Sequence, residues 1–282
     1  MNFLTFLQTV DRRFLYAMLL LAICIPFFYT PEIRVPIQPS TQKMYDEIND
    51  LKENDFVLFG VDWGAGTRGE SRAQTEALMR HCMKKKLRFA IMAIGEPQAK
   101  QLAQTIALAL QKEYGYVQGI NWVNFGYKAD PENYLKAWVQ NIPGSIGTDI
   151  RGIPVSTMPV MKGITTARDI NFLIDVTPTS AYESYIKFVQ GSFNLKMGVA
   201  VTSVMGPEAF NRLDSNQIVG LIVGLQGAVE YEQLLGYKGA ATRASISSSF
   251  AHLLIIGFII LGNVAMILER RQRARLSMGG TA

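Results

Sequence analysis

Residues 56–69 read FVLFGVDWGAGTRG, a short apolar run followed by an aspartate, a tryptophan and a glycine-rich segment. A continuous apolar run that ends at turn-forming residues is typical of a strand buried on both faces, as in a parallel sheet. Four further runs of this kind follow, at residues 87–94, 122–125, 172–174 and 197–201. The stretch 56–69 therefore indicates the first strand of such a sheet and the loop that leaves it.

Helical patterns separate these runs. The clearest covers residues 99–112, where apolar side chains recur every three or four positions, with lysine and glutamine opposite them. Strand–helix alternation predicts an α/β domain with a Rossmann-like, mostly parallel sheet. Residues 142–165, with four Gly and three Pro, are expected to form a long irregular connection that faces a partner or carries function. The other expected helices cover residues 40–52 with Ser40 as cap, 70–86, 130–140, 180–190 and 214–235.

Two uncharged stretches flank the expected domain, 17 residues at 14–30 and 25 residues at 244–268. A membrane-spanning helix needs about 20 apolar residues, so 244–268 is predicted to span a membrane. The first stretch has the length of a signal peptide, but the residues around Cys24 offer no small-x-small cleavage site. This favours an uncleaved anchor. A third uncharged stretch, 215–229, is too short for an ordinary span.

The placement of arginine predicts the orientation of both spans. Arg12 and Arg13 precede the first, and four arginines between 270 and 275 follow the second, whereas the opposite flanks hold only Arg34, Lys238 and Arg243. Because Lys and Arg accumulate on the cytoplasmic side, both termini are expected inside the plasma (inner) membrane. The segments are then a cytoplasmic amphipathic start with the first span (1–30), an extracytoplasmic α/β domain (31–243), the second span (244–268) and a cytoplasmic arginine-rich tail (269–282).

Composition excludes several classes of protein. The hydrophobic fraction of 49% excludes a disordered chain, and two cysteines exclude a disulfide scaffold. The two ends, residues 1–30 and 244–282, carry six of the 28 basic and two of the 23 acidic residues. That leaves 22 basic and 21 acidic residues for the middle. The basic footprint of a nucleic-acid-binding protein is missing, so we expect no nucleic-acid partner.

The glycines between 64 and 69 match G-x-G-x-x-G between a strand and a helix, the pattern that admits a pyrophosphate in dinucleotide-binding folds. Two details weaken the match. Asp62 precedes the glycines where phosphate would arrive, and the next acidic residue after the second strand, Glu96, lies 27 positions beyond Gly69 instead of about 20. We therefore interpret the segment as a crossover loop and expect no cofactor.

A ligand of an open α/β sheet binds beyond the carboxyl ends of the strands. Asp62 and Asp175 each follow an apolar run directly, so both are expected at that edge. Two carboxylates there can serve acid–base chemistry or hold a hard cation. The alternative, which we favour, is that each caps a helix or pairs with a basic neighbour, Arg68, Arg72 or Lys128. The candidate ligand-binding residues are Asp62, Trp63, Arg68, Glu70, Glu96 and Asp175.

Catalytic or metal sites built on histidine are excluded by the small number of histidines and by their positions. The chain has two histidines, His81 beside Cys82 on an expected helix and His252 in the expected second span. Neighbouring helical residues point about 100° apart, which excludes a Cys–His pair, and no two histidines have metal-site spacing. We assign no metal ligands and no catalytic residues, and we expect Cys82 to be a small buried apolar group.

The expected order of one span, an α/β outer domain and one span resembles the layout of ectodomain-bearing auxiliary subunits that accompany some bacterial ABC transporters, with no motif in common. The resemblance implies a non-enzymatic, transporter-associated component whose outer domain binds a ligand, a membrane-protein partner or a second copy. Gly220, Gly224 and Gly227 permit close helix packing, either within the domain or between copies. The alternative function is a membrane-tethered hydrolase or transferase that uses Asp62, Glu96 or Asp175.

Overall fold

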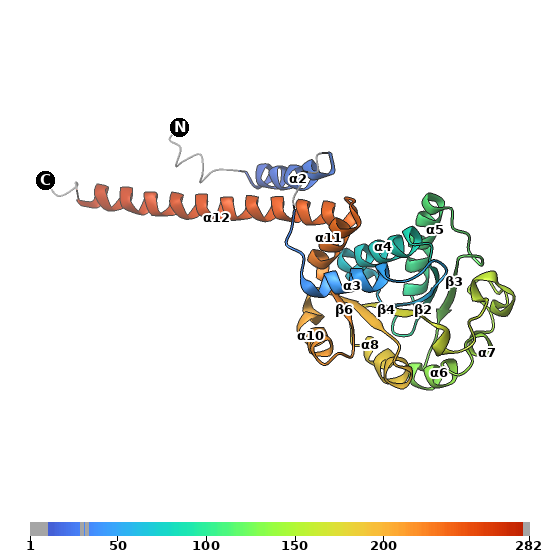
Figure 1. Cartoon of the computed structure of the whole chain (residues 1–282). Helices are drawn as coiled ribbons and strands as arrows, with labels where there is room; N and C mark the ends of the chain where they lie inside the picture. Colours follow the sequence, from blue (N-terminus) through green and yellow to red (C-terminus); the bar gives the residue numbers. More distant parts are fainter. Residues whose placement is uncertain (1–10, 29–30, 32–33, 279–282) are drawn as a thin grey trace. The chain divides into compact units, whose positions relative to one another are not determined.

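A six-stranded, all-parallel sheet organises residues 34–241 in the computed structural model, which describes residues 11–28, 31 and 34–278 (Figure 1). The strand order is β3-β2-β1-β4-β5-β6. This is the order of the Rossmann fold, in which successive strands step away from β1 on one side and then from β4 on the other. The predicted α/β domain with a mostly parallel sheet is confirmed. The strands are β1 (Phe56–Val61), β2 (Arg88–Ala93), β3 (Trp122–Tyr127), β4 (Phe172–Thr177), β5 (Met197–Val201) and β6 (Gly220–Val223).

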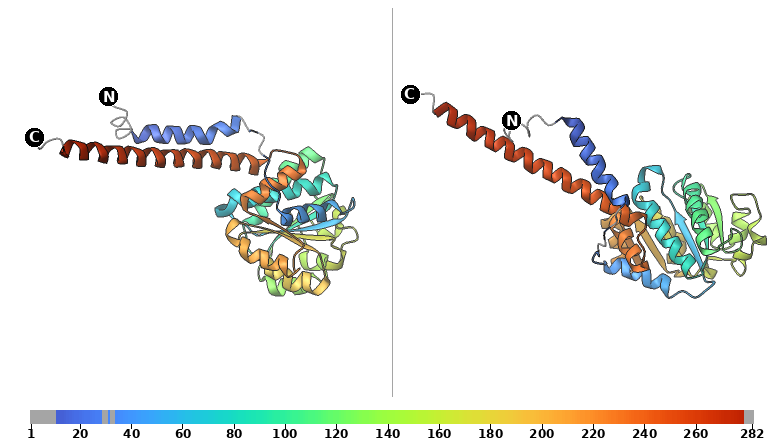
Figure 2. Two further views of the ribbon diagram at one scale, coloured as in Figure 1. Left: turned by 60° about the vertical axis from the view of Figure 1, so that its left-hand side comes forward. Right: turned by 90° about the horizontal axis from the view of Figure 1, so that it is seen from above.

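Helices cover both faces of the sheet (Figure 2). One face packs against α3 (Pro39–Asn49), α4 (Arg68–Lys84), α5 (Ala99–Tyr114) and α11 (Gly224–Leu235). The other packs against α6 (Pro131–Trp138), α7 (Ile142–Ile146), α8 (Tyr182–Tyr185), α9 (Gly191–Phe193) and α10 (Gly206–Asp214). The connections include 3₁₀ turns at Ala65–Thr67, Val155–Thr157, Pro159–Met161, Ala167–Asp169 and Ser203–Met205, and a π turn at Ile186–Gln190.

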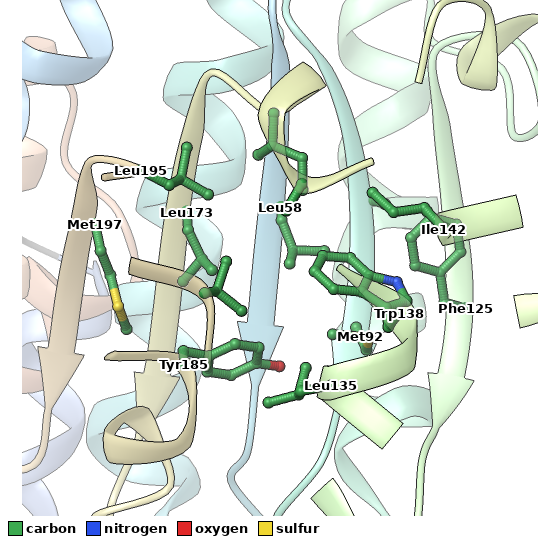
Figure 3. Packing of buried hydrophobic residues seen from close by; sticks show 14 of the residues in the cluster. Leu58, Met92, Phe125, Leu135, Trp138, Ile142, Leu173, Tyr185, Leu195 and Met197 are labelled. Atoms are coloured by element: carbon green, nitrogen blue, oxygen red, sulfur yellow. The ribbon is translucent and has the colours of Figure 1, made fainter. Parts of the chain in front are cut away.

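The strands are apolar on both faces because both faces are buried. Leu58 and Leu173 point to the α6–α10 face, where Figure 3 shows them among Leu135, Trp138 and Tyr185. The next residue along each strand, as in Phe59 of β1, points to the opposite face. Side chains of successive strand residues alternate between the faces, so a strand covered on both sides is a continuous apolar run.

The expected helix at 214–235 is wrong. α10 ends at Asp214, β6 follows, and α11 begins at Gly224. A Cβ on Gly220 would lie 2.6 Å from the Cα of Met44, so close packing of α3 on β6 requires glycine here. At Gly224 the backbone turns from strand to helix with φ of +63°, which also favours glycine. These glycines therefore serve packing and turning inside the domain.

Two smaller expectations also need correction. The cap position of α3 is Gln38, with Pro39 as the first helical residue, so Ser40 lies inside the helix. β4 continues to Thr177, which places Asp175 within the strand and not after it. A strand can continue through a polar residue when tertiary contacts cover that residue, and the sequence pattern does not reveal such cover.

The segments outside the domain are two helices, α2 (Arg12–Phe28) and α12 (Ala240–Met278). Among the described residues, one helix is long and apolar enough to cross a membrane, α12 over Ala240–Arg271, and 6% of its most apolar window is buried. α2 has 17 residues. The expected amphipathic start at 1–10 and the side chains of Arg273 and Arg275 lie outside the described residues.

Helix α11 holds both ends of the domain. The side-chain amide of Gln233 accepts a hydrogen bond from the N–H of Val35 at 2.9 Å and donates one to its C=O at 3.1 Å. Glu230 accepts from the N–H of Gln38 at 3.0 Å. The carboxylate of Glu232 accepts from the N–H groups of Gly239 and Ala241, each at 2.9 Å. The segment that enters the domain and the segment that leaves it are therefore fastened to the same helix.

Candidate functional site

Asp62 lies directly after β1, at the point where the strand order reverses. Its Oδ1 accepts hydrogen bonds from the N–H groups of Ile94 and Gly95, at 2.7 and 2.6 Å, in the loop that follows β2. Its own N–H donates to the C=O of Val176 on β4 at 2.9 Å. Neither amide that Asp62 binds belongs to a helix, so the expectation that it caps a helix is wrong. Asp62 instead joins the ends of β1, β2 and β4.

Asp175 lies on β4 opposite Gly60 of β1, and its carboxyl group lies close enough to that of Asp62 for each to affect the pKa of the other. Among the described residues it forms neither the expected helix cap nor the expected ion pair. Asp62 is 2% exposed and Asp175 is fully buried. Two neighbouring carboxyl groups buried in this way do not both ionise readily, so their titrations are linked.

The two carboxyl groups differ in what stabilises their charged forms. Burial, and then the charge of Asp62, raise the pKa of Asp175 well above its ordinary value. Burial also raises the pKa of Asp62, but the N–H groups of Gly95 and Ile94 oppose the rise by stabilising its charged form. The charged form is therefore better stabilised at Asp62 than at Asp175.

Tyr185 of α8 completes a group that we call the carboxyl cluster: Asp62, Asp175 and Tyr185. A Cβ on Gly60 would lie 2.6 Å from Oδ1 of Asp175 and 2.9 Å from Cε2 of Tyr185, so glycine lets the ring lie against β1. Burial, and then the charges of the two aspartates, raise the pKa of Tyr185 well above its ordinary value. Sequence analysis missed Gly60 and Tyr185. A glycine inside an apolar strand run is the available signal, because it marks close approach of another group.

The carboxyl cluster has few hydrogen-bond partners. Within the described ranges, Oδ2 of Asp62, both carboxyl oxygens of Asp175 and the hydroxyl of Tyr185 are buried and have no hydrogen-bond partner. The nearby hydroxyl of Tyr134 on α6 is also buried without a hydrogen-bond partner among the described residues. More than about nine in ten buried polar groups in proteins are hydrogen-bonded, so this concentration calls for a functional explanation.

The four remaining predicted site residues lie in four different environments. Glu96 lies at the same edge, since a Cβ on Gly64 would lie 3.2 Å from its Oε2. Glu70 accepts hydrogen bonds from the N–H and hydroxyl of Ser203 and so ties α4 to the loop after β5. Trp63 is buried, and its indole N–H donates to Thr75 at 2.9 Å, which makes it a core residue. Arg68 is exposed at the start of α4.

The glycine loop begins α4 through a 3₁₀ turn, Ala65–Thr67. A Cβ on Gly66 or Gly69 would meet nothing within 4 Å, whereas one on Gly64 would press against Glu96. The last glycine of the dinucleotide fingerprint normally permits close packing of helix and strand. Gly69 has no such contact, so packing accounts for Gly64 and not for the two glycines after it.

Residues 178–193 cover the carboxyl cluster. A Cβ on Gly95 would lie 3.2 Å from the Cβ of Ala181 and 3.4 Å from that of Asp62, so Gly95 is held between this segment and Asp62. After one turn of α8 the segment passes through the π turn and the three residues of α9. π turns are rare and concentrate at functional sites.

His81 lies on the other face of the sheet. Its Nδ1 is 2.7 Å from the hydroxyl of Tyr231, and its ring stacks on Tyr45 with centroids 4.6 Å apart. Burial, and then the charges of Lys85 and Lys84, lower the pKa of His81 to about 3. His81 is therefore a neutral core residue. Cys82 is fully buried, as predicted.

A surface depression of about 550 Å³ lies away from the carboxyl cluster. Its lining comes from α6, from the segment before β4 and from the end of residues 178–193, and it includes Arg168, Phe188 and Phe193. No residue of the carboxyl cluster lines it. Within the part of the chain that the structure describes, no group of three or more His, Cys, Asp or Glu could hold a metal ion.

No protein-family model and no curated protein matches this chain. Solved structures that resemble it include an OtsA apo structure, with a TM-score of 0.35 and 15% identity over 82% of this chain and 46% of that one. Another is a trehalose-6-phosphate synthase OtsA, with a TM-score of 0.32 and 13% identity over 88% and 49%. An E. coli structure described with bound UDP-2-fluoro glucose gives 0.30 and 14% over 82% and 46%. The chain spans about half the length of each, and likeness at this level carries no argument about function.

Proposed function

We propose that this protein is a two-span protein of the plasma membrane, with both termini in the cytoplasm and residues 31–243 outside. Its α/β domain binds a partner protein or a ligand at the carboxyl edge of the sheet, as a component of a membrane assembly of the transporter-associated type. The boundaries of the spans and of the tail are those expected from the sequence.

The observation that carries this proposal is the exposure of α12. A helix that is apolar over the length of a bilayer and 6% buried cannot be a core helix of this chain as described. In water it would expose apolar surface at a cost of about 25 cal/mol per Å². A bilayer removes that cost.

Two further observations support a second anchor. α2 has 17 residues without an acidic group and with its only arginines at the start. At 1.5 Å per residue it is about 26 Å long, slightly less than the roughly 30 Å of a hydrocarbon core. The attachment of both linkers to α11 also suits a chain that enters and leaves one membrane, because the two linkers then start from one helix of the domain.

Labelling of introduced cysteines tests the topology. In a Cys24→Ser background, Ser156→Cys on the domain should react with a membrane-impermeant maleimide in intact spheroplasts, and Ser277→Cys in the tail should react only after lysis. Cys82 is fully buried and serves as an unreactive internal control. The reverse labelling pattern contradicts the orientation, and labelling of both positions in intact cells contradicts two spans.

Site-specific crosslinking tests the binding edge. Val204, in the turn after β5, is 87% exposed at the carboxyl edge, and Val117, before β3, is 49% exposed at the amino edge. A photo-crosslinking residue at Val204 should capture a stoichiometric partner in the membrane, identified by mass spectrometry, and one at Val117 should not. Capture at Val117 alone, or a monomer at both positions, rejects the proposed edge.

A second function, a membrane-tethered hydrolase or transferase, is favoured by one observation, two neighbouring buried carboxyl groups whose pKa values burial raises. Perturbed carboxyl pairs of this kind serve acid–base chemistry in many active sites. The double variant Asp62→Asn/Asp175→Asn separates the two functions. Crosslinking at Val204 and a cellular role that both survive in the variant support the binding component. A variant that folds better, keeps its partners and loses its cellular role supports the enzyme.

A further inference from the structure

We propose that α12 pairs inside the membrane with the α12 of a second copy of this protein, through one face that we call the polar seam. The polar seam consists of Ser249, His252, Ile256, Ile259, Asn263 and Met266. The pairing rests on the membrane span proposed above for α12. It adds a surface for self-association that is separate from the carboxyl edge of the sheet.

The polar seam follows a seven-residue repeat. Its members are separated by three and four residues in turn, from Ser249 to Met266. In a helix with 3.6 residues per turn, this spacing keeps every member on one face. The same repeat packs two helices as a left-handed coiled coil, the usual hand of membrane-spanning bundles. The next position of the repeat is Arg270, so the polar seam ends where the expected span ends.

The strongly polar side chains of the expected span both lie on this face. Between residues 250 and 268 they are His252 and Asn263, and every other residue there is apolar or glycine. The two are 11 positions apart, which is three turns of the helix. Polar side chains inside a membrane are costly and nearly always face other protein groups, so this shared face is expected to meet protein and not lipid.

Asn263 has hydrogen-bonding capacity that α12 does not use. Its Nδ2 donates to the C=O of Ile259, one turn earlier, at 2.8 Å. Among the described residues no other group bonds to this amide, so one N–H and the side-chain carbonyl oxygen have no partner. Hydrocarbon offers neither a donor nor an acceptor. Both groups therefore favour a second helix that supplies them.

The polar seam is also the less covered face of α12. On the seam, Ile256 and Ile259 are 52% and 57% exposed. Ala265, nine residues after Ile256 and so half a turn around the helix axis, is 5% exposed. Leu254 and Phe258, on the same side as Ala265, are half-buried. A single copy therefore covers the side opposite the polar seam better than the seam itself.

The occupant that this face fits is a second copy of α12. All copies enter the membrane in the same orientation, because the same arginines set it, so two copies lie parallel and each seam residue meets its own counterpart. An asparagine amide both donates and accepts, and so does a neutral imidazole, so Asn263 and His252 can each bond to their counterparts. A single asparagine in a heptad seam is a known means of fixing the register of two parallel helices.

Disulfide crosslinking of the full chain in its own membrane tests the pairing. The background is Cys24→Ser, in which the remaining Cys82 is fully buried. Ile259→Cys places a thiol on the polar seam, and oxidation should link two copies into a dimer. Ile260→Cys is the matched control, because Ile260 is also 57% exposed but points about 100° away from Ile259, and it should stay monomeric.

Energy transfer between copies that carry donor and acceptor dyes at Ser277→Cys, in lipid vesicles, measures the affinity of the pair. Asn263→Leu should weaken pairing about 3- to 30-fold, the range of a hydrogen bond between membrane helices. Asn263→Gln should weaken it less, because it keeps a donor and an acceptor.

Four outcomes overturn the pairing: no crosslink at Ile259→Cys, equal crosslinking at Ile260→Cys, a disulfide from Ile259→Cys to a different protein, or an Asn263→Leu variant with the affinity of the wild type. Labelling of Ser277→Cys separates this failure from that of the proposed topology. Labelling only after lysis leaves the two spans standing and rejects the pairing alone, whereas labelling in intact spheroplasts rejects the topology.

Discussion

Two buried polar clusters lie on opposite faces of the same sheet, and they differ in hydrogen bonding. On the α4 face, the neutral ring of His81 is hydrogen-bonded to Tyr231 and stacks on Tyr45. On the α8 face, Asp62, Asp175 and Tyr185 are as deeply buried, but four of their oxygens have no hydrogen-bond partner among the described residues. The first arrangement stabilises a fold, whereas the second is tolerated where function requires it.

The largest expected difference between the clusters lies in their pH dependence. His81 has a pKa of about 3 in the folded chain and 6.5 as its ordinary value. The contribution of neutral His81 to the free energy of unfolding is fully present above about pH 6.5. It is lost as the pH falls toward 3, with a slope that approaches about 1.4 kcal/mol per pH unit. Thermal unfolding of the full chain in detergent at a series of pH values measures this. The loss should be smaller in His81→Gln, and equal slopes in both proteins would remove His81 from the explanation.

Removal of a hydroxyl sharpens the comparison at fixed pH. Tyr231→Phe should cost about 1–3 kcal/mol, because Nδ1 of His81 loses its partner in a buried place. Tyr185→Phe should cost almost nothing, because its hydroxyl has no described partner to lose. Urea unfolding monitored by tryptophan fluorescence gives both values under one condition. A cost for Tyr185→Phe as large as that for Tyr231→Phe would mean that the carboxyl cluster is fully bonded.

Neutralising one carboxyl group should stabilise the protein. Because folding raises the pKa of Asp175, its protonated form contributes to the free energy of unfolding below its ordinary pKa. That contribution is lost as the pH rises through the pKa of Asp175 in the folded protein. At pH 8, Asp175→Asn should therefore gain about 0.5–2 kcal/mol. The control is Asp169→Asn, which should lose stability, because backbone N–H groups, chiefly that of Thr166, lower the pKa of Asp169. Loss of stability in both variants would contradict a strained pair.

The smallest expected effect concerns the glycine loop beside the carboxyl cluster. Gly66→Ala should gain about 0.4–1 kcal/mol, since its side chain meets open space and the unfolded chain loses freedom. Gly64→Ala should gain less, because the carboxylate of Glu96 must move. Calorimetric titration of the wild type with NAD and NADP should show no heat of binding. Micromolar affinity that is lost in Gly66→Val would restore the dinucleotide interpretation.

Most of the sheet was predictable because its strands are buried on both faces and read as continuous apolar runs. The sixth strand was not, because residues 215–229 are apolar and glycine-rich in a way that fits a buried helix or a buried strand equally well. The contact that distinguishes them, Met44 against Gly220, joins positions far apart in the chain. A local pattern does not contain that information.

The candidate site, like the sheet, was predictable from the sequence only in part. The sequence predicted that Asp62 and Asp175 come to one edge of the sheet, because parallel strands end on the same side. It led us to favour helix caps, since acidic residues at strand ends are common where helices start. The proximity of the two carboxyl groups depends on β1 and β4 being neighbours with Gly60 opposite Asp175. The sequence alone therefore determined the fold class and the edge at which polar side chains gather, through local hydrophobic periodicity. Only the tertiary structure decided which strands are neighbours, and hence that two acids are buried together at the edge of the sheet, because strand order and side-chain burial are set by contacts between distant parts of the chain.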